Sequence, residues 1–259
     1  MPEGDTVWRA AHHLHEVLAG RELTRTDFRV PAHATLDLSG RVVDEVVSRG
    51  KHLLIRVDDA SIHSHLKMEG SWHVHRLGTR WRRPAHQARA VLETAEHQAV
   101  GYSLGILEVL QRDQEDHAVG HLGPDVLGPD WDLDEAVRRV GADPDRPVFL
   151  ALLDQRNLAG LGNEYVNELL FLSGLAPRRR VGSVRDLDGL VRRGHLLLQT
   201  NKSRVERTFT GNTRPGQERW VYRRERGRCR RCGTRLRSGQ LGDEPTQERN
   251  TFWCPHCQP

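Results

Sequence analysis

Apolar residues near the amino terminus recur with the spacing of a helix. Asp5, whose carboxylate suits a helix N-cap, precedes the first of them, and Gly20 ends the run. The pattern therefore predicts a helix that begins almost at the start of the chain and is capped by Asp5. Its apolar positions are Val7, Ala10, Ala11, Leu14, Val17 and Leu18.

From residue 22 to about residue 122 the pattern changes to short apolar runs separated by Gly, Asp and Pro. Runs of this length, rich in β-branched residues and bounded by turn residues, are typical of strands. This part of the chain predicts a β-rich domain, which we expect to be a two-layer sandwich. The clearest strand-like runs are 42–47, 52–57, 71–75 and 88–92.

A stretch dense in Gly, Pro and Asp, HLGPDVLGPDWD at 121–132, follows the β-rich part. Such punctuation indicates a linker or a hinge. Beyond it the pattern is helical as far as about residue 200, and the basic end of the chain contains every cysteine. We expect helices over 133–140, 146–158, 163–172 and 183–198.

At 259 residues the chain exceeds the usual size of a single domain. We predict a multidomain α+β protein in which a short β-hairpin module, too small for a core of its own, ends the chain. The expected limits are 1–125 for the β-rich domain, 126–133 for the hinge, 134–215 for the helical domain and 216–259 for the cysteine module.

Composition argues against a membrane protein or a secreted one. Hydrophobic residues make up 37% of the chain, and no stretch approaches the about 18 uninterrupted apolar residues that a membrane span needs. The first residues, MPEGDTVWRAA, carry neither the basic flank nor the apolar block of a secretory signal. We therefore expect a soluble, cytoplasmic protein.

Arginine dominates the positive charge, since only three lysines occur among 39 basic residues. A genome rich in G and C would favour arginine overall, but it would not cluster it. Between residues 214 and 237 ten arginines stand against two acids, with Trp220 and Tyr222 interleaved. Release of counterions from a polyanion rewards such a patch, so the composition indicates a nucleic-acid partner.

The four cysteines form two C-x2-C pairs separated by twenty-one residues: Cys229 with Cys232, and Cys254 with Cys257. Two such pairs bring four thiolates around one zinc ion and stabilise a module too small to fold on apolar burial alone. A closed four-sulfur site has no open coordination position, so we expect one structural zinc per chain. Two disulfides are the alternative, but nothing in the sequence suggests export.

The amino terminus offers a nucleophile. Removal of Met1 would expose Pro2 as a secondary amine, which can attack an anomeric carbon and form an iminium ion. Glu3 stands beside it and could move protons. Taken alone, the Pro-Glu pair is more often an ordinary disordered terminus than a catalytic one.

Three further positions fit the same chemistry. Lys51 follows a glycine at the start of an apolar run, where the plain alternative is one surface charge. Asn163 ends a glycine turn between two helical stretches and could cap the helix or donate to a phosphate, although a structural turn explains it equally well. Met68 lies in a glycine-bounded loop, where it could wedge into a base stack or be a core residue.

Together these motifs resemble the formamidopyrimidine-DNA glycosylase and endonuclease VIII family, on its endonuclease VIII-like side. The resemblance covers essentially the whole chain, and several motifs in the family's order make it specific. It rests on PEG at 2–4, GK at 50–51, HLKMEG at 65–70, HLGP at 121–124, DQRNLAGLGNEY at 154–165 and RNTFWCPHCQ at 249–258.

The resemblance implies an N-terminal catalytic β-sandwich with a leading helix, a helix-two-turn-helix DNA-binding domain and a zinc-finger β-hairpin. It implies a bifunctional DNA glycosylase and AP lyase of base excision repair, with the lesion nucleoside flipped into a pocket between the domains. Pro2 would be the Schiff-base nucleophile, Glu3 the acid/base carboxylate and Lys51 a phosphate-contacting residue required for catalysis. Asn163 would bind the phosphate beside the lesion, Arg249 would be the zinc-finger arginine that contacts the same region, and Met68 would fill the vacated space.

The chain departs from the family pattern in two places. Thr6 stands where many relatives carry a glutamate, and the long gap between the cysteine pairs indicates an enlarged hairpin around 238–247.

The expected substrate is DNA that contains an oxidised pyrimidine or an abasic site. The alternatives are an enzyme for oxidised purines, an enzyme for bulky or crosslinked bases, and a non-catalytic protein that binds damaged DNA. We expect a monomer without a small-molecule cofactor or a membrane partner, working in the bacterial cytoplasm and reaching the nucleoid through DNA.

Overall fold

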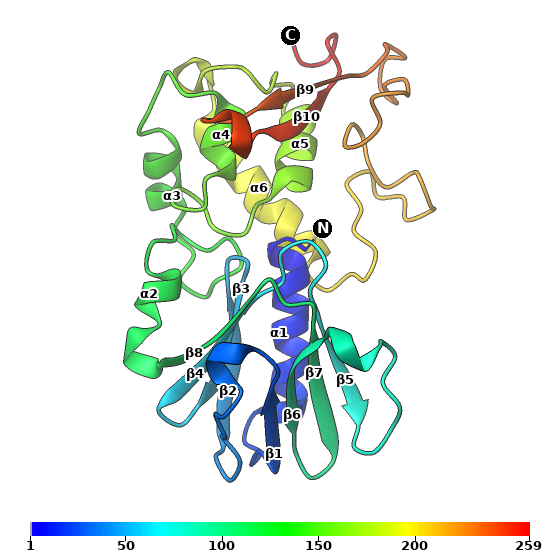
Figure 1. Ribbon diagram of the computed structural model, residues 1–259. Helices are drawn as coiled ribbons and strands as arrows, with labels where there is room; N and C mark the ends of the chain where they lie inside the picture. The colour runs from blue at the N-terminus through cyan, green and yellow to red at the C-terminus, as the bar shows by residue number, and fades with distance from the viewer. Residues whose placement is uncertain (1) are drawn as a thin grey trace. The chain divides into compact units, whose positions relative to one another are not determined.

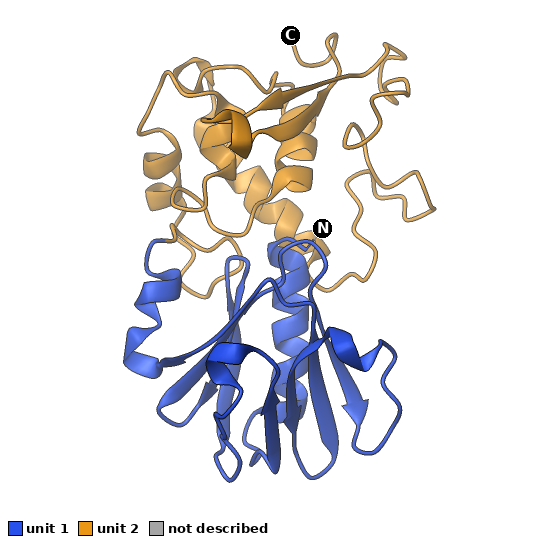
Figure 2. Cartoon of the chain, viewed as in Figure 1, with its two compact units in different colours: residues 1–121 blue, residues 122–259 orange. Residues whose placement is uncertain are grey.

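The computed structural model describes residues 2–259, and Met1, whose removal the sequence predicts, lies outside them (Figure 1). The chain divides into two compact units, residues 1–121 and residues 122–259 (Figure 2). The first unit carries two four-stranded sheets and the second carries the longer helices together with a β-hairpin. The domain limits expected from the sequence, at residues 125, 133 and 215, stay predictions.

Helix α1 (Gly4–Leu18) opens the first unit and buries Val7, Leu14 and Leu18 along one face, as the periodicity predicts. The expected N-cap is wrong. The carbonyl of Glu3 accepts the backbone N–H groups of Thr6 at 3.0 Å and Val7 at 3.1 Å, so Glu3 is the N-cap. Asp5 lies within the first turn, where its carboxylate accepts the N–H of Thr6 at 2.7 Å.

Two antiparallel sheets make up most of the first unit. One has the strand order β1-β6-β7-β5 and the other the order β2-β3-β4-β8. The run predicted over 52–57 coincides with β3, and the other three predicted runs cover most of β2, β5 and β6. The remaining four strands were not predicted individually. The bounds are β1 (Arg25–Phe28), β2 (Val43–Arg49), β3 (His52–Val57), β4 (Ala60–His65), β5 (Ser71–Arg76), β6 (Ala88–Glu93), β7 (His97–Tyr102) and β8 (Ile106–Gln111).

The two sheets and α1 share one apolar core. Ile55 from the second sheet, Leu92 from the first and Leu14 from the helix belong to the same buried cluster, and none is more than 1% exposed. Alternate residues of β3, namely Leu53, Ile55 and Val57, belong to this core, so one face of the strand is buried in it. The expected sandwich with a leading helix is confirmed.

Short helices complete the first unit. Glu115, at the start of the last of them, accepts hydrogen bonds from Arg56 at 2.8 and 2.6 Å and from Ser61 at 2.7 Å, which fastens this segment to the polar face of the second sheet. The bounds are η1 (Pro31–His33), η2 (Ala85–Gln87), η3 (Arg112–Gln114) and α2 (Asp116–Val119).

The second unit is built around α5, whose residues are nearly all buried. Asp132 caps α3 by accepting the N–H of Glu135 at 3.0 Å, and Asp186 caps α6 by accepting the N–H of Gly189 at 2.8 Å. The helices are α3 (Leu133–Val140), α4 (Val148–Leu153), α5 (Asn163–Leu172), η4 (Val181–Ser183) and α6 (Leu187–Asn201).

The helix expected over 146–158 is shorter than predicted. Helix α4 ends at Leu153, because Asp154 adopts an extended conformation and its carboxylate binds Arg146 and Arg156, each at 3.1 Å. The helix expected over 183–198 is displaced toward the carboxyl end, since its cap is Asp186. In both cases polar side chains set the boundary that apolar periodicity alone misplaces.

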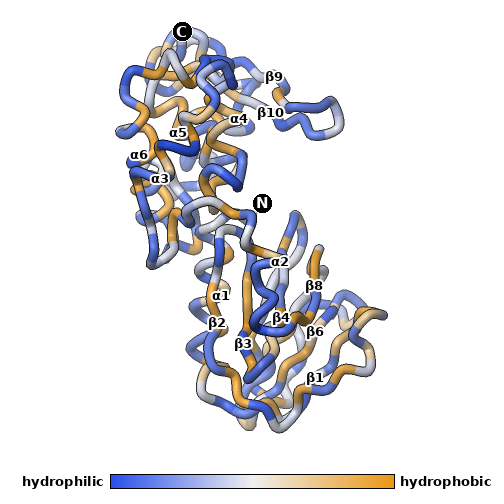
Figure 3. The backbone as a smooth tube through the Cα atoms, turned by 90° about the vertical axis from the view of Figure 1, so that its left-hand side faces the viewer, coloured by the Kyte–Doolittle hydropathy of each residue, from blue (hydrophilic) through white to orange (hydrophobic). Residues whose placement is uncertain are grey.

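A hairpin of β9 (Arg237–Leu241) and β10 (Arg249–Trp253), with η5 (Pro245–Gln247) in its connection, follows a long segment without helix or strand. The connection is strongly hydrophilic, in contrast to α4 and α5 (Figure 3). The hairpin module predicted for the end of the chain is confirmed. Among the described residues, no helix is both long and apolar enough to span a lipid bilayer.

Candidate functional site

The four cysteine sulfurs come together at the base of the hairpin. Sγ of Cys229 lies 3.9 Å from Sγ of Cys257, Sγ of Cys232 lies 3.5 Å from Sγ of Cys254, and all four lie within 4.8 Å of one another. A tetrahedral zinc with Zn–S bonds of about 2.3 Å requires sulfurs about 3.7 Å apart. The four thiols therefore fit around one metal ion. All four are free thiols, so the two-disulfide alternative is wrong.

Helix α5 holds the segment that leads into the cysteines. The carboxylate of Glu168 accepts three consecutive backbone N–H groups, from Trp220 at 2.8 Å, Val221 at 2.9 Å and Tyr222 at 2.8 Å. Glu168 is fully buried, and burial raises its pKa to about 7 although the three N–H groups favour the charged form. Trp220 also stacks on Phe171 with ring centroids 5.4 Å apart. The sequence did not single out Glu168 as a residue that would organise this segment.

Part of the arginine cluster has the same structural task. Arg219 donates to the carboxylate of Glu164 at 2.6 Å, and Arg224 donates to the carbonyl of Trp220. Arg226 and Arg237, in contrast, are exposed and form no ion pair with a described residue. The cluster predicted as one phosphate-binding patch is therefore divided between internal support and exposed positive charge.

Pro2 and Glu3 lead directly into α1. Pro2 is half-buried, and Glu3 is fully buried as the N-cap residue. The N–H groups of the first turn give this end of the helix a partial positive charge, which favours a carboxylate there. The fold therefore holds the residue that follows Met1 against an ordered helix, which argues against a disordered terminus.

Lys51 lies in the turn between β2 and β3. Gly50, before it, has a φ of 58°, a conformation that glycine adopts without strain. Lys51 is half-buried, so part of the residue faces solvent, and its phosphate-contacting role stays a prediction.

A hydrogen-bonded row of side chains begins at His52, the residue after Lys51. Nδ1 of His52 lies 2.8 Å from Nε2 of His63, and Nδ1 of His63 lies 2.7 Å from Oε1 of Glu108. The ring of His65 meets that of His52 edge-on, with centroids 4.9 Å apart. Sequence reasoning missed this row, although two histidines two residues apart on one strand must share a face.

Burial keeps two of these histidines neutral at ordinary pH. It lowers the pKa of His52 to about 3, assisted by the neighbouring charges of His65, His63, His121 and Lys67. Burial also lowers the pKa of His65 to about 4, and Lys67 and Lys51 add to the effect. Imidazoles beside Lys51 therefore contribute hydrogen-bonding groups and not additional positive charge.

Met68 lies at the tip of the turn between β4 and β5. It is 60% exposed, so the core position considered from the sequence is wrong. The turn closes through the N–H of Gly70, which donates to the carbonyl of Leu66 at 2.9 Å. A Cβ at Gly70 would lie only 2.5 Å from that oxygen, so the turn that presents Met68 requires glycine.

Asn163 is the first residue of α5, and Gly162 is the N-cap, so a capping role for Asn163 is wrong. Its side chain is 7% exposed, and its Oδ1 accepts a hydrogen bond from Nδ2 of Asn167 at 3.1 Å. Arg249 opens β10 and is exposed. Its guanidinium donates to the carbonyls of Gln247 and Glu248, each at 3.3 Å.

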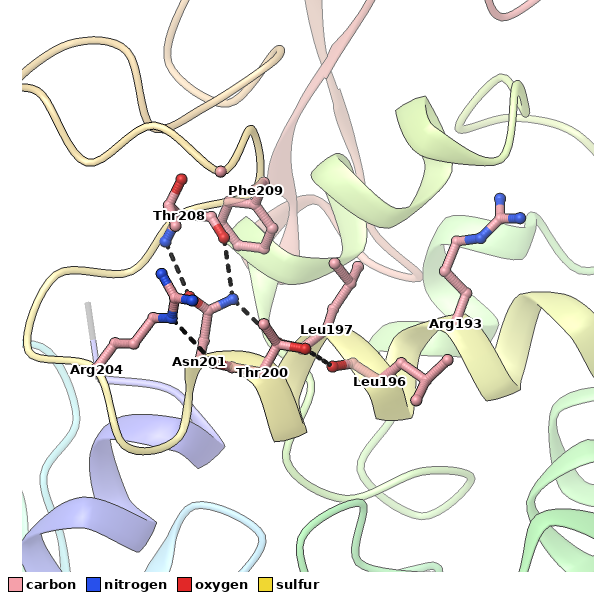
Figure 4. Close-up of a pocket in the computed structure, with 9 residues that line it drawn as sticks. Arg193, Leu196, Leu197, Thr200, Asn201, Arg204, Thr208 and Phe209 are labelled. Carbon is pink, nitrogen blue, oxygen red and sulfur yellow. Dashed lines mark hydrogen bonds between the residues drawn. The ribbon is translucent and has the colours of Figure 1, made fainter.

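A separate cavity of about 240 Å³ lies along α6 in the second unit (Figure 4). Arg193 and Arg204 stand at its ends and Phe209 lines it. Asn201 shapes its wall by accepting the N–H of Thr208 at 2.9 Å and donating to the carbonyl of the same residue at 3.1 Å. None of the site residues predicted from the sequence lines this cavity.

Two family models match the chain. The model of the formamidopyrimidine-DNA glycosylase N-terminal domain matches residues 1–103, and the model of the formamidopyrimidine-DNA glycosylase H2TH domain matches residues 122–191. Among solved structures, Lactococcus lactis formamidopyrimidine-DNA glycosylase, non-covalently bound to DNA with an AP site, aligns with a TM-score of 0.81. It covers 99% of both chains at 22% identity, so the likeness defines the fold.

Curated relatives extend over the full chain. The DNA-(apurinic or apyrimidinic site) lyase Nei2 of Mycolicibacterium smegmatis is 54% identical over 258 residues and covers 100% of this chain and 99% of the relative. Endonuclease 8 2 of Mycobacterium tuberculosis is 51% identical and covers 100% of both chains. The chain belongs to the formamidopyrimidine-DNA glycosylase and endonuclease VIII family, which confirms the resemblance and the expected fold class.

The structure places the predicted site residues in two groups. Pro2, Glu3, Lys51 and Met68 belong to the first unit. Asn163, Arg249 and the four cysteines belong to the second. The roles that the resemblance implies for these residues remain proposals.

Proposed function

We propose that the chain is a bifunctional DNA glycosylase and AP lyase of base excision repair. The observation that carries this proposal is the amino-terminal segment, in which Pro2 and the buried Glu3 lead into α1. This segment belongs to a chain that is 54% identical, over 258 residues, to a protein named as a DNA-(apurinic or apyrimidinic site) lyase. The partner is DNA that contains a damaged base or an abasic site.

The chemistry begins at the nitrogen of Pro2, once Met1 has been removed. The amine attacks C1′ of the damaged nucleoside, the bond from C1′ to the base breaks, and the base leaves with a proton. Glu3 is the group beside the amine that donates a proton to the sugar ring oxygen as the ring opens. The product is an iminium ion that links Pro2 to the deoxyribose.

That iminium accepts electrons in the two steps that cut the strand. Loss of a proton from C2′ breaks the bond to the 3′ phosphate, and a second elimination across C4′ releases the 5′ phosphate. Hydrolysis then frees the Pro2 amine for another turnover. An amide nitrogen cannot form this ion, so activity requires a free amino terminus at Pro2.

Phosphate contacts hold the substrate in register. Lys51 supplies a cation at a fixed turn, and Asn163 and Arg249 bind the phosphate beside the lesion. Met68, at an exposed turn tip, occupies the space that the flipped nucleoside leaves. These assignments follow the family resemblance. The turn positions of Lys51 and Met68 and the exposure of Arg249 support them.

The metal is a single structural zinc ion. Four free thiols with sulfur separations near those of a tetrahedral zinc site support the assignment to Cys229, Cys232, Cys254 and Cys257. Its coordination is complete with protein ligands, so it stabilises the hairpin that carries Arg249 and takes no part in the bond-breaking steps.

Oxidised pyrimidines are the proposed lesions, with oxidised purines and bulky or crosslinked bases as the alternatives. We further propose that the protein acts as a monomer, without a small-molecule cofactor, on nucleoid DNA of the bacterial cytoplasm. A panel of duplex and single-stranded oligonucleotides, each with one defined lesion, tests the substrate choice. Excision of oxidised purines at a higher kcat/KM than oxidised pyrimidines would overturn it.

Borohydride trapping tests the proposed reaction. The protein with Met1 removed should form a covalent adduct with an abasic-site oligonucleotide in borohydride, because reduction fixes the iminium. Absence of the adduct, with DNA binding retained, would favour a non-catalytic protein that binds damaged DNA.

A further inference from the structure

Asn167 is a buried residue that joins the two elements carrying Asn163 and Arg249. It lies on α5 one turn after Asn163, and its side chain is 0% exposed. Its Nδ2 donates to the backbone carbonyl of Asn163 at 2.7 Å, to Oδ1 of Asn163 at 3.1 Å and to the carbonyl of Asn250 at 3.3 Å. Its Oδ1 accepts the N–H of Phe252 at 2.6 Å. One carboxamide therefore connects the start of α5 to β10.

The first consequence is the orientation of the Asn163 side chain. Because Nδ2 of Asn167 donates to Oδ1 of Asn163, the carboxamide of Asn163 cannot rotate by 180° without opposing two NH2 groups. Within residues 2–259, no side chain or backbone group accepts a hydrogen bond from Nδ2 of Asn163. This NH2 group is therefore held as a donor with capacity for a ligand.

The second consequence is the position of the hairpin. Along a strand, the N–H and C=O groups of alternate residues point to the same edge. The groups of Asn250 and Phe252 that face Asn167 lie on the edge of β10 opposite to the edge paired with β9. The carboxamide of Asn167 thus pairs with β10 as a peptide group of a third strand would. It fixes the register of the strand that Arg249 opens, one residue before Asn250.

We propose that Asn167 is a positioning residue of the DNA-binding surface, which orients the Asn163 carboxamide and holds Arg249 at a fixed separation from it. This inference rests on the proposed function, in which Asn163 and Arg249 bind the same phosphate. Asn167 itself touches no DNA because it has no exposed surface. A small anionic target requires its two donors to be placed together, and the four hydrogen bonds of Asn167 supply that placement.

The test measures the affinity of the zinc-loaded protein for a duplex with a tetrahydrofuran abasic-site analogue, by fluorescence anisotropy. Asn167→Ala should weaken binding about tenfold, the cost of one or two misplaced hydrogen bonds. In the background Asn163→Ala plus Arg249→Ala, the same substitution should change the affinity less than twofold. An equal loss in both backgrounds would overturn the proposal, because it would indicate general destabilisation.

Asn201→Ala is the matched control. Asn201 is also 0% exposed in the second unit, and it also makes side-chain hydrogen bonds to a neighbouring loop, but these reach Thr208 and not Asn163 or β10. Any loss of affinity in this variant should be the same in both backgrounds. Zinc content and the thermal unfolding temperature of every variant show whether the fold is retained. If Asn167→Ala loses zinc, Asn167→Leu, which keeps more of the side-chain volume, is used in its place.

The salt dependence of binding gives a second readout. One phosphate contact by an arginine contributes a slope of about −0.9 to the logarithm of affinity against the logarithm of salt concentration. Asn167→Ala should reduce the slope by up to about this amount as Arg249 leaves the phosphate, and Asn201→Ala should not. If Asn163→Ala and Arg249→Ala leave the affinity unchanged, the proposed phosphate contacts are wrong. If both weaken binding while Asn167→Ala is additive with them, only the positioning role fails.

Discussion

Glu168→Gln tests whether one buried carboxylate holds the cysteine module to α5. In the native protein, Oε1 accepts the N–H groups of Val221 and Tyr222, and Oε2 accepts that of Trp220. A glutamine can keep the oxygen that serves two donors. Its NH2 group then faces the N–H of Trp220, so two donors oppose each other in a site with no exposed surface.

The expected loss of stability follows from that single mismatch. A buried donor without an acceptor costs about 1–3 kcal/mol. Loss of the charge itself adds little near neutral pH, because burial already raises the pKa of Glu168 to about 7. We therefore expect Glu168→Gln to lower the free energy of unfolding by about 1–3 kcal/mol, which corresponds to about a five- to 150-fold change in the unfolding equilibrium.

The effect should depend on pH with a definite sign. Since the folded pKa of about 7 lies above the ordinary value of 4.5, the folded protein binds more protons than the unfolded chain between these values. The stability that Glu168 contributes to the native protein therefore falls as the pH rises from 4.5 to about 7, whereas the glutamine does not titrate. The difference between the two proteins should be larger at pH 5.5 than at pH 8.

Urea unfolding and release of zinc to a chromogenic chelator measure the effect. Glu168→Gln should unfold at a lower urea concentration and release zinc more readily, whereas Glu244→Gln, an exposed charge removal in the hairpin connection, should do neither. Urea midpoints and zinc release equal to those of the native protein would refute the role assigned to the three hydrogen bonds.

Three further outcomes are expected. Cys254→Ser should lose the zinc ion and the hairpin fold together, and full zinc stoichiometry in that variant would contradict the four-sulfur assignment. An amino-terminal extension should abolish borohydride trapping, whereas Pro2→Gly keeps a weaker amine nucleophile. Strand nicking by the extended protein equal to that of the native protein would contradict the Schiff-base mechanism. His52 and His65 have pKa values of about 3 and 4 in the folded protein, so between pH 6.5 and 4 the unfolded chain binds more protons at these residues than the folded protein does. Their contribution to stability should therefore fall as the pH drops through this range. His52→Asn should flatten this dependence by up to about 1.4 kcal/mol per pH unit in urea unfolding, and an unchanged slope would contradict the burial argument.

Local patterns in the sequence predicted a large part of this protein. The period of apolar residues after Gly4 predicted α1, and the two C-x2-C pairs predicted a four-sulfur cluster, because both signals lie within a few neighbouring residues. The family motifs predicted the fold class, whereas the roles that they indicate for the site residues stay predictions. Helix boundaries were less well predicted. The apolar pattern extends the helix to residue 158, but α4 ends at Leu153, five residues earlier, where Asp154 binds its side-chain partners.

The tertiary structure alone decided which distant side chains meet. Glu168 binds backbone groups 52 to 54 residues away, and Asn167 binds β10 at a separation of 83 to 85 residues. His63 meets Glu108 across two paired strands, 45 residues apart. No local period encodes such pairs, because chain folding determines which elements pack together and burial then makes each polar partner necessary.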